Sequence, residues 1–292
     1  MTLKTFVLCC AGVCSVIHAL AAAEKTISQD GVWFTYDPSL FSKVEIFEAK
    51  PKVSPAEGPE SGSRRPAMLG LRFYAGPDSI GSIGILSVGD DLAAGADYPY
   101  LAKYLAELRT LLRDKPNLRD VARGTHEEGA GLPTFPFPNA GQTFLTKLRY
   151  LSLPWGEAIS YLAQYAQDRS QYAIGYDYEF KLSRLSYEIH GLTGDGAISI
   201  SAHFPMMHPR LKSGENQKLA EAEHEIMTDE QYIRFLSRME RILDKEPDES
   251  FTPSIATLDR LIASIRIDMD EVKNWLARFA DQTITIQSST AK

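Results

Sequence analysis

The chain has 292 residues, of which 44% are hydrophobic and 24% are charged, a composition typical of a globular protein with a substantial core. Its formal net charge of −7 argues against a nucleic-acid partner, because an acidic protein repels the phosphate backbone. No apolar run beyond residue 23 approaches the roughly 20 residues of a spanning helix, so we expect no integral membrane segment after that point.

Residues 1–23 are typical of a cleaved signal peptide. Lys4 precedes an apolar run over residues 6–17, and small residues with the A-x-A pattern follow up to Ala23. An uncleaved anchor is the alternative, but the run is short for a membrane span. We therefore expect a periplasmic or secreted protein. Cleavage would remove every cysteine of the chain, and with them any disulfide or thiol nucleophile: Cys9, Cys10 and Cys14.

The first part of the expected domain reads as strands. β-Branched and aromatic residues predict strands over 31–36 and 43–49. Residues 51–66 contain four prolines and two glycines with almost nothing apolar, which predicts a long loop. A hairpin is expected between residues 68–74 and 80–88.

A helix is predicted next, over about residues 98–114, where leucines and a tyrosine recur at helical spacing on one face before Pro116. Two further hairpins are expected, joining 144–151 to 157–167 and 185–191 to 197–204. The first turns at Leu153-Pro154-Trp155-Gly156, which suits a type I turn.

Two amphipathic helices are predicted near the C-terminus. Thr228 is expected to cap the first, and Thr252 the second, with Pro253 at its first helical position. Sequential hairpins imply antiparallel pairing. Helices with one apolar stripe must bury that stripe, and a sheet face is a suitable surface for it. The prediction is a single α+β domain over residues 24–270, followed over 271–292 by a short amphipathic segment and a polar tail.

No catalytic or metal-binding motif is convincing. Ser82 lies in IGSIG, where Ile80 replaces the first glycine of a nucleophile elbow. His224-Glu225 begins like a zinc helix, but Thr228 stands where the second histidine must be. His126 lies in a glycine-flanked acidic loop, where a solvated charge run is the simpler interpretation. We expect no metal and no cofactor.

Three histidines that lie close in sequence could form a metal-binding cluster: His190, His203 and His208. If Thr193 pairs with Gly196, His190 lies about 13 Å along the strands from His203, which is too far for one metal ion. That register puts Ser186, Glu188 and His190 on one face with Ser199, Ser201 and His203. We interpret it as a solvated polar sheet face.

Aromatic residues are unusually concentrated in one stretch. Six of the 13 tyrosines lie in it: Tyr161, Tyr165, Tyr172, Tyr176, Tyr178 and Tyr187. Tyr176, Tyr178 and Phe180 alternate with charged residues and would share one face of an extended segment. They could form an exposed binding platform, or a strand that covers the core. The candidate ligand-binding residues are Trp155, expected to be exposed at its hairpin tip, and Tyr172, Tyr176 and Tyr178.

The segments NAGQTF, SYLAQYAQ, HGLTGDGAISISAHFPMMHP and SFTPSIATLDRLIASI resemble an uncharacterised family of exported bacterial globular proteins, over about residues 31–267. The chain departs from that family by extra residues around Tyr172 to Lys181. The resemblance carries no known activity or site residue. Its layout is similar to the PsbP-like sandwich, which implies an antiparallel sheet between helices.

The sequence favours an exported, non-enzymatic protein that binds a small ligand or an envelope partner through a sheet face and the aromatic insert. One alternative is a cell-envelope hydrolase whose carboxylates and histidines meet only in the fold, in a pocket that gathers His126, His203 or His208 with an acid. Another is a structural accessory subunit. These alternatives stay open at the level of sequence.

Overall fold

The computed structural model describes residues 23–49, 52–53, 64–88, 99–123, 131–135, 140–166, 176–177, 182–212 and 229–280. The expected signal peptide, most of the proline-rich loop, and the candidate residues Tyr172 and Tyr178 lie outside these ranges. Within them, no helix has the length and apolar character that a membrane crossing requires.

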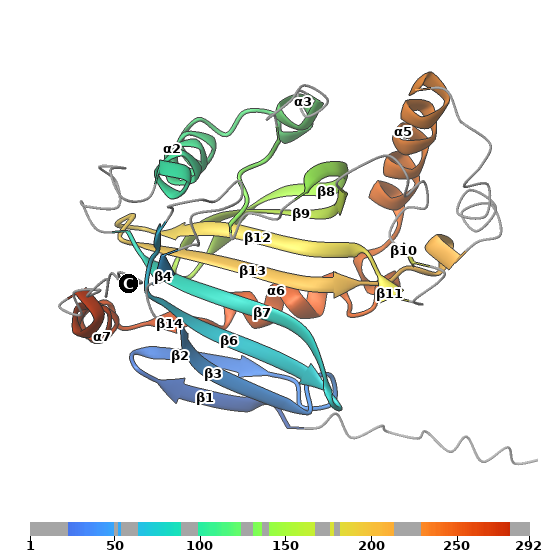
Figure 1. The fold of residues 1–292 in the computed structure, drawn as a ribbon. Helices are drawn as coiled ribbons and strands as arrows, with labels where there is room; N and C mark the ends of the chain where they lie inside the picture. The colour runs from blue at the N-terminus through green and yellow to red at the C-terminus, as the bar shows by residue number, and fades with distance from the viewer. Residues whose placement is uncertain are drawn as a thin grey trace, which may run out of the picture.

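A seven-stranded antiparallel sheet forms the centre of the fold, in the order β3-β6-β7-β13-β12-β9-β8 (Figure 1). The three expected hairpins are present as β6–β7, β8–β9 and β12–β13. The strands are β3 (Lys43–Ala49), β6 (Met68–Ala75), β7 (Asp78–Ser87), β8 (Gly141–Leu153), β9 (Gly156–Ala166), β12 (Leu185–Thr193) and β13 (Ile198–Met206).

A second, three-stranded sheet joins distant parts of the chain. β1 (Lys25–Gln29) pairs with β2 (Val32–Tyr36), and β2 also pairs with β14 (Arg266–Ile267). Ser264 secures the junction, because its Oγ accepts the backbone N–H of Thr35 at 2.9 Å. Two short pairs complete the described strands: β4 (Lys52–Val53) with β5 (Arg64–Arg65), and β10 (Tyr176–Asp177) with β11 (Leu182–Ser183).

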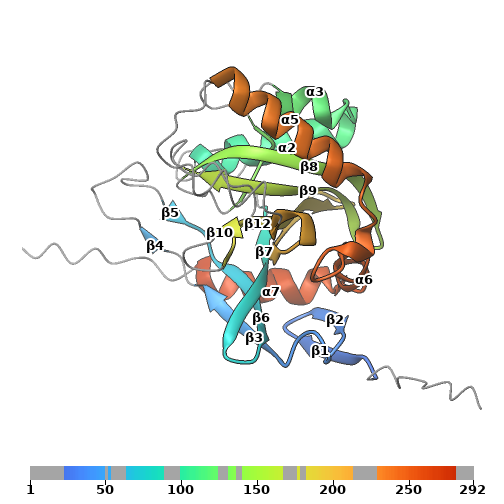
Figure 2. The same ribbon diagram turned by 90° about the vertical axis from the view of Figure 1, so that its right-hand side faces the viewer.

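Helices pack against both faces of the seven-stranded sheet. On one face lie α2 (Pro99–Asp114) and α3 (Leu118–Arg123); on the other lie α6 (Ile255–Ala263), α7 (Met269–Ala280) and the three-stranded sheet (Figure 1). The longest described helix, α5 (Asp229–Lys245), lies against β8 (Figure 2). Two 3-10 turns follow β13 and α5: η2 (Pro209–Lys212) and η3 (Asp248–Ser250). The α+β prediction is confirmed.

The sheet separates two apolar cores. The larger core includes packed aromatic rings such as Phe41 and Phe73, whose centroids lie 4.9 Å apart. The smaller core holds the predicted stripe of α2 against β9. Between them, β12 is buried at every residue from Leu185 to Thr193. A strand buried on both faces must satisfy any polar side chain internally, which is where the candidate site arises.

One expectation about the C-terminal segments is wrong, and another is confirmed in part, because the amphipathic segment after residue 270 lies in helix α7. Helix α6 begins at Ile255 with Ser254 as the N-cap residue, and Thr252 instead forms a β-bridge with Met207. The segment beyond residue 270 packs as part of the fold, since Val272 and Trp275 of α7 are buried in the larger core. The side chain of Trp275 also donates to Glu48 Oε1 at 2.8 Å.

Candidate functional site

The register of the β12–β13 hairpin brings a histidine and a glutamate together. Glu188 pairs with His203, and His190 pairs with Ser201, because residues 194–197 form a four-residue connection. The predicted pairing of Thr193 with Gly196 is therefore wrong by two residues. This shift places His203 directly across from a carboxylate.

The face that carries these residues is covered rather than solvated over β12. Ser186, Glu188 and His190, together with Ser199 and Ser201 of β13, are all buried. Helix α2 packs against β12 on this face, where Tyr104 contacts His190. The prediction that these side chains share a face is confirmed, but the prediction that they are solvated is wrong. The apolar stripe of α2 packs against this face of the sheet.

Glu188 and His203 form a close pair with unequal exposure. Glu188 Oε1 accepts hydrogen bonds from Ser186 Oγ at 2.6 Å and from His203 Nδ1 at 2.7 Å. The His203 side chain is 51% exposed, whereas that of Glu188 is only 5% exposed. The pair therefore places a buried carboxylate beneath an imidazole that solvent can reach.

The pairing shifts the pKa values of both groups. Burial acts to raise the pKa of Glu188, but the hydrogen bonds and charges of His203, with help from His190 and Ser186, outweigh it and hold that pKa below its usual value. Burial acts to lower the pKa of His203, but the hydrogen bond and charge of Glu188 raise it above its usual value. Each partner thus stabilises the ionised form of the other.

His190 lies two residues after Glu188 on β12, on the same face of the sheet, and completes the cluster. Its Nδ1 lies 3.3 Å from the hydroxyl of Tyr104, and its ring stacks on Tyr161. Its Nε2 lies 3.8 Å from Glu188 Oε2 and has no hydrogen-bond partner among the described residues. Burial lowers the pKa of His190 to about 4, so the ring is neutral at pH 7.

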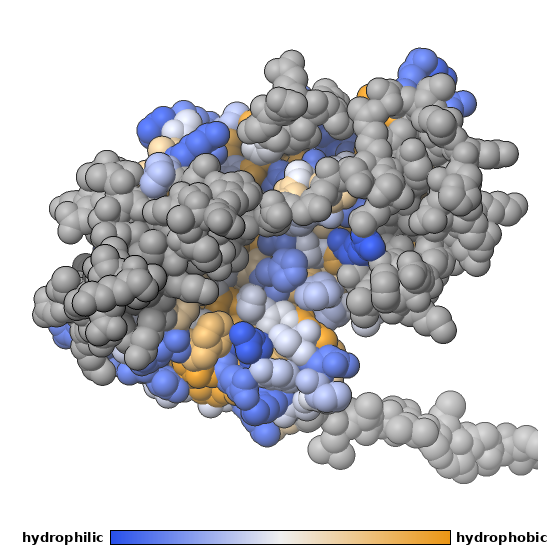
Figure 3. All heavy atoms as spheres, in the orientation of Figure 1, coloured by the Kyte–Doolittle hydropathy of each residue, from blue (hydrophilic) through white to orange (hydrophobic). Residues whose placement is uncertain are grey.

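A shallow hollow of about 260 Å³ opens beside the pair, at the end of the sheet where β12 begins and β13 ends. From His203 a row of aligned residues also runs outward across the same face, through Ser82 and Arg72 to Glu45. Hydrophilic side chains lie over β6, β7 and β13 between the grey segments (Figure 3). The hollow is lined by Tyr165, Arg184, Leu185, Ser186, His203 and Pro205.

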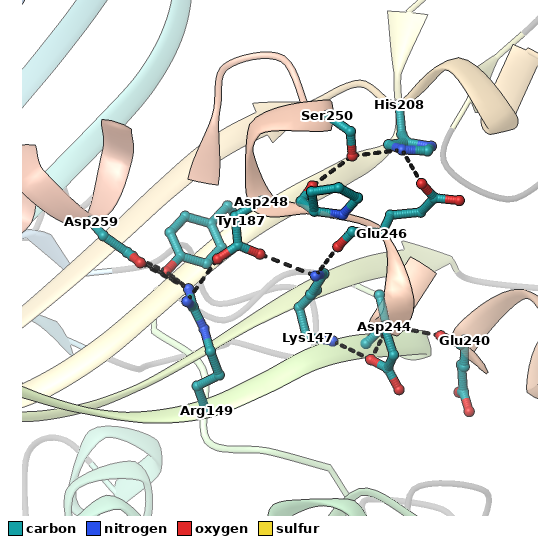
Figure 4. Close-up of polar contacts among 12 residues, drawn as sticks. Lys147, Arg149, Tyr187, His208, Glu240, Asp244, Glu246, Asp248, Ser250 and Asp259 are labelled. Carbon is teal, nitrogen blue, oxygen red and sulfur yellow. Dashed lines mark hydrogen bonds and ion pairs between the residues drawn. The ribbon is translucent and has the colours of Figure 1, made fainter. Parts of the chain in front are cut away.

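A second polar cluster joins β8 to the segment from α5 to α6 (Figure 4). It is built on a bulge in β8, where Lys147 adopts a left-handed φ of 56°. The backbone N–H of Lys147 donates to Asp244 Oδ1 at 2.8 Å, and its Nζ donates to Asp248 Oδ1 at 3.0 Å. The bulge thus turns both a backbone and a side-chain donor toward the helical segment.

Arg149 continues that cluster into the sheet. Its guanidinium forms ion pairs with Asp248 at 3.2 Å and Asp259 at 3.1 Å, and it donates to the Tyr187 hydroxyl at 2.8 Å. Tyr187 in turn donates to Asp259 at 2.5 Å. Since the acidic groups of this cluster face cations across the junction, we interpret it as the joint that holds α5, η3 and α6 on the sheet.

His208 belongs to this joint. Its Nδ1 accepts the backbone N–H of Arg210 at 3.2 Å, which places the proton on Nε2. Nε2 lies 3.0 Å from Ser250 Oγ, and Ser250 donates to the carbonyl of Pro247 at 2.6 Å. The ring is buried, and burial lowers its pKa, so His208 is a neutral structural residue.

Trp155 is not the exposed aromatic that its hairpin-tip position predicts. Its ring is buried, and Nε1 donates to the carbonyl of Ile262 on α6 at 3.1 Å. The turn folds over the sheet, so the indole fills the space above Gly191. Trp155 therefore packs in the core and does not present a ligand-binding surface.

The other tyrosine candidates are only partly described. Tyr176 lies in β10, and Tyr172 and Tyr178 fall outside the described residues. His126 and His224 fall outside as well. Among the described residues, no group of three histidine, cysteine, aspartate or glutamate side chains is arranged to hold a metal ion.

The comparisons give no relative from which to carry over a role. Neither a protein-family model nor a curated protein matches the chain. The site is therefore interpreted from its own geometry. Of the sequence candidates that the structure describes, His203 is the one that meets an acid beside a hollow. Sequence reasoning placed Glu188 on the same face but did not identify it as the partner of His203.

Proposed function

We propose that the protein is an exported, non-enzymatic binding protein that takes a small ligand or an envelope partner through the sheet face around His203 and the aromatic insert. One observation carries the proposal: a buried carboxylate lies beneath a half-exposed imidazole at a hollow. Removing a carboxylate from water costs several kcal/mol before its pairing repays it. An apolar side chain would fill the same place at no such cost.

The position of the hollow supports a role for the aromatic insert. Tyr165 lies at the end of β9, and Arg184 immediately precedes β12, so both flank the segment that carries Tyr172, Tyr176 and Tyr178. A ligand in the hollow would therefore meet the residues through which the insert leaves and rejoins the sheet.

The test is native mass spectrometry of protein purified from the envelope fraction of its own host. We expect a bound mass that leaves on unfolding, and at least a tenfold loss of occupancy in His203→Ala. The control is Glu107→Ala, which removes an exposed side chain of α2. A clean mature mass, or a bound mass that His203→Ala retains in full, would contradict the proposal.

A hydrolase is the second candidate, and the cross-strand row favours it. Ser82 of β7 is the register partner of His203, so a hydroxyl, an imidazole and a carboxylate lie in order on three adjacent strands. In that role His203 would be the general base and Glu188 would orient it through Nδ1. No hydrogen bond joins Ser82 to His203 among the described residues, so the serine would have to be engaged on substrate binding.

A fluorophosphonate probe distinguishes this candidate. If the hydrolase assignment is right, the probe labels Ser82 in the wild type, and both Ser82→Ala and His203→Ala abolish labelling. Ser79→Ala, on the same strand, should leave labelling unchanged. Absence of label in the folded wild type would rule out Ser82 as an activated nucleophile.

A further inference from the structure

The hollow beside His203 has an uneven charge. Among the described residues that line it, Arg184 and His203 are bases and none is an acid. Tyr165 and Ser186 add hydroxyl groups, while Leu185 and Pro205 supply the apolar wall. In a chain whose formal net charge is −7, a lining of this kind is a local exception.

Glu188 does not cancel that character, because it lies behind the lining. Its Oε1 already accepts the bonds from Ser186 and His203. The carboxylate therefore acts on the imidazole rather than on whatever enters the hollow. It also fixes the ring, since Nδ1 is the nitrogen that it binds.

The opposite ring nitrogen of His203 is the available donor. Within the described part of the chain, Nε2 has no hydrogen-bond partner, and half of the side chain is exposed. A ring whose Nδ1 binds a carboxylate carries a proton on Nε2 when it is charged. The raised pKa of His203 keeps a share of the rings in that form near neutral pH.

We propose that the hollow binds an oxyanion, a carboxylate or phosphate group of the ligand, with His203 Nε2–H and the Arg184 guanidinium as its donors. Charge-assisted hydrogen bonds of this kind are stronger and shorter than neutral ones. The inference rests on the proposed function and specifies its chemistry: the ligand or partner is anionic where it meets the sheet.

The test follows the imidazole of His203 by NMR while sodium phosphate or sodium acetate is added. Sodium chloride at matched ionic strength is the control for screening, and choline chloride is the control for a cationic ligand. We expect a saturable shift with an oxyanion only. Phosphate binding tighter than acetate would identify a phosphate group as the better match, and the reverse order would identify a carboxylate.

Two variants and the pH dependence of oxyanion binding test the role of His203 and Arg184. His203→Asn and Arg184→Gln should each weaken oxyanion binding at least tenfold, whereas Arg113→Gln, at an exposed site on α2, should not. Affinity should fall as the pH rises through the His203 pKa. Among the described residues, Glu188 and His190 are the charged or titratable groups that act on this ring, and Tyr165 and Arg184 line the hollow with it. Of these, His190 is neutral and Tyr165 has a raised pKa, so neither changes charge in that range.

The inference would be overturned by shifts no larger than those of sodium chloride, or by binding that survives His203→Asn unchanged. Its failure is distinguishable from failure of the proposed function. A ligand mass lost in His203→Ala without any oxyanion response would leave a binding protein with a neutral ligand. Absence of a bound mass would remove the proposed function itself.

Discussion

Replacing Glu188 by alanine is expected to lower the free energy of unfolding by about 2 kcal/mol at pH 6, because it removes the buried carboxylate that accepts from Ser186 and pairs with the half-exposed His203. Urea unfolding measures the change. Glu107→Ala, which removes an exposed i,i+4 pair, should change stability by less than about 0.5 kcal/mol.

The pH dependence of this effect has a definite sign at each end. The pKa of Glu188 is lowered on folding, so its contribution is present above its usual value of 4.5 and is lost as the pH falls through the folded pKa. The pKa of His203 is raised on folding, so its contribution is present below its usual value of 6.5 and is lost as the pH rises through the folded pKa. The destabilisation by Glu188→Ala should therefore be largest between pH 4.5 and 6.5.

Glu188→Gln separates charge from shape. The amide can still accept the two hydrogen bonds, but it no longer stabilises a charged imidazole. The pKa of His203, followed by NMR, should then fall below its wild-type value. An unchanged His203 pKa in Glu188→Gln would show that the carboxylate does not control the ring.

Gly156→Ala is expected to destabilise the fold by about 3 kcal/mol, near the upper end of what overpacking costs. A Cβ at this position would lie 2.0 Å from the carbonyl oxygen of Leu192 and 2.8 Å from Thr193 Cα. Both obstacles are backbone atoms of the interior strand β12, which is buried on both faces and paired on both edges, so that it cannot move aside. Urea unfolding measures the loss.

Gly194→Ala is the matched control for that variant. It changes the neighbouring hairpin by the same methyl group, at a site with no heavy atom within 4 Å of the added Cβ. We expect its stability to lie within about 0.5 kcal/mol of the wild type, as for most surface substitutions. Equal losses of unfolding free energy in the two variants would show that the clash with Leu192 does not cause the destabilisation by Gly156→Ala.

Local patterns predicted most of the secondary structure. The strand over Lys43–Ala49, the stripe of α2 and the turn at Pro154-Trp155 all follow from spacing and turn chemistry over a few residues. The start of α6 was missed because Thr252-Pro253 looks like a helix start, and its pairing with Met207 is a tertiary contact.

The candidate site could be predicted only in part, because it depends on register and layering. Alternation put Glu188, His190 and His203 on one face, which the structure confirms. The number of residues in the β12–β13 connection decided which of them meet, and turn residues alone gave the wrong number. The stripe of α2 required a sheet face, but nothing in the sequence says which face it covers.

The pairing of β14 with β2 also constrains the order in which the fold can be completed. The hairpin of β1 and β2 can form as soon as its residues are synthesised, yet its sheet gains a third strand only from residues 266–267. Ser264 bonds to Thr35 across 229 positions of sequence. During synthesis from the N-terminus, the edge of β2 that β14 covers therefore stays unpaired until residues 266–267 have been made. The pairing of β14 with β2 therefore costs the entropy of closing a loop that spans almost the whole domain.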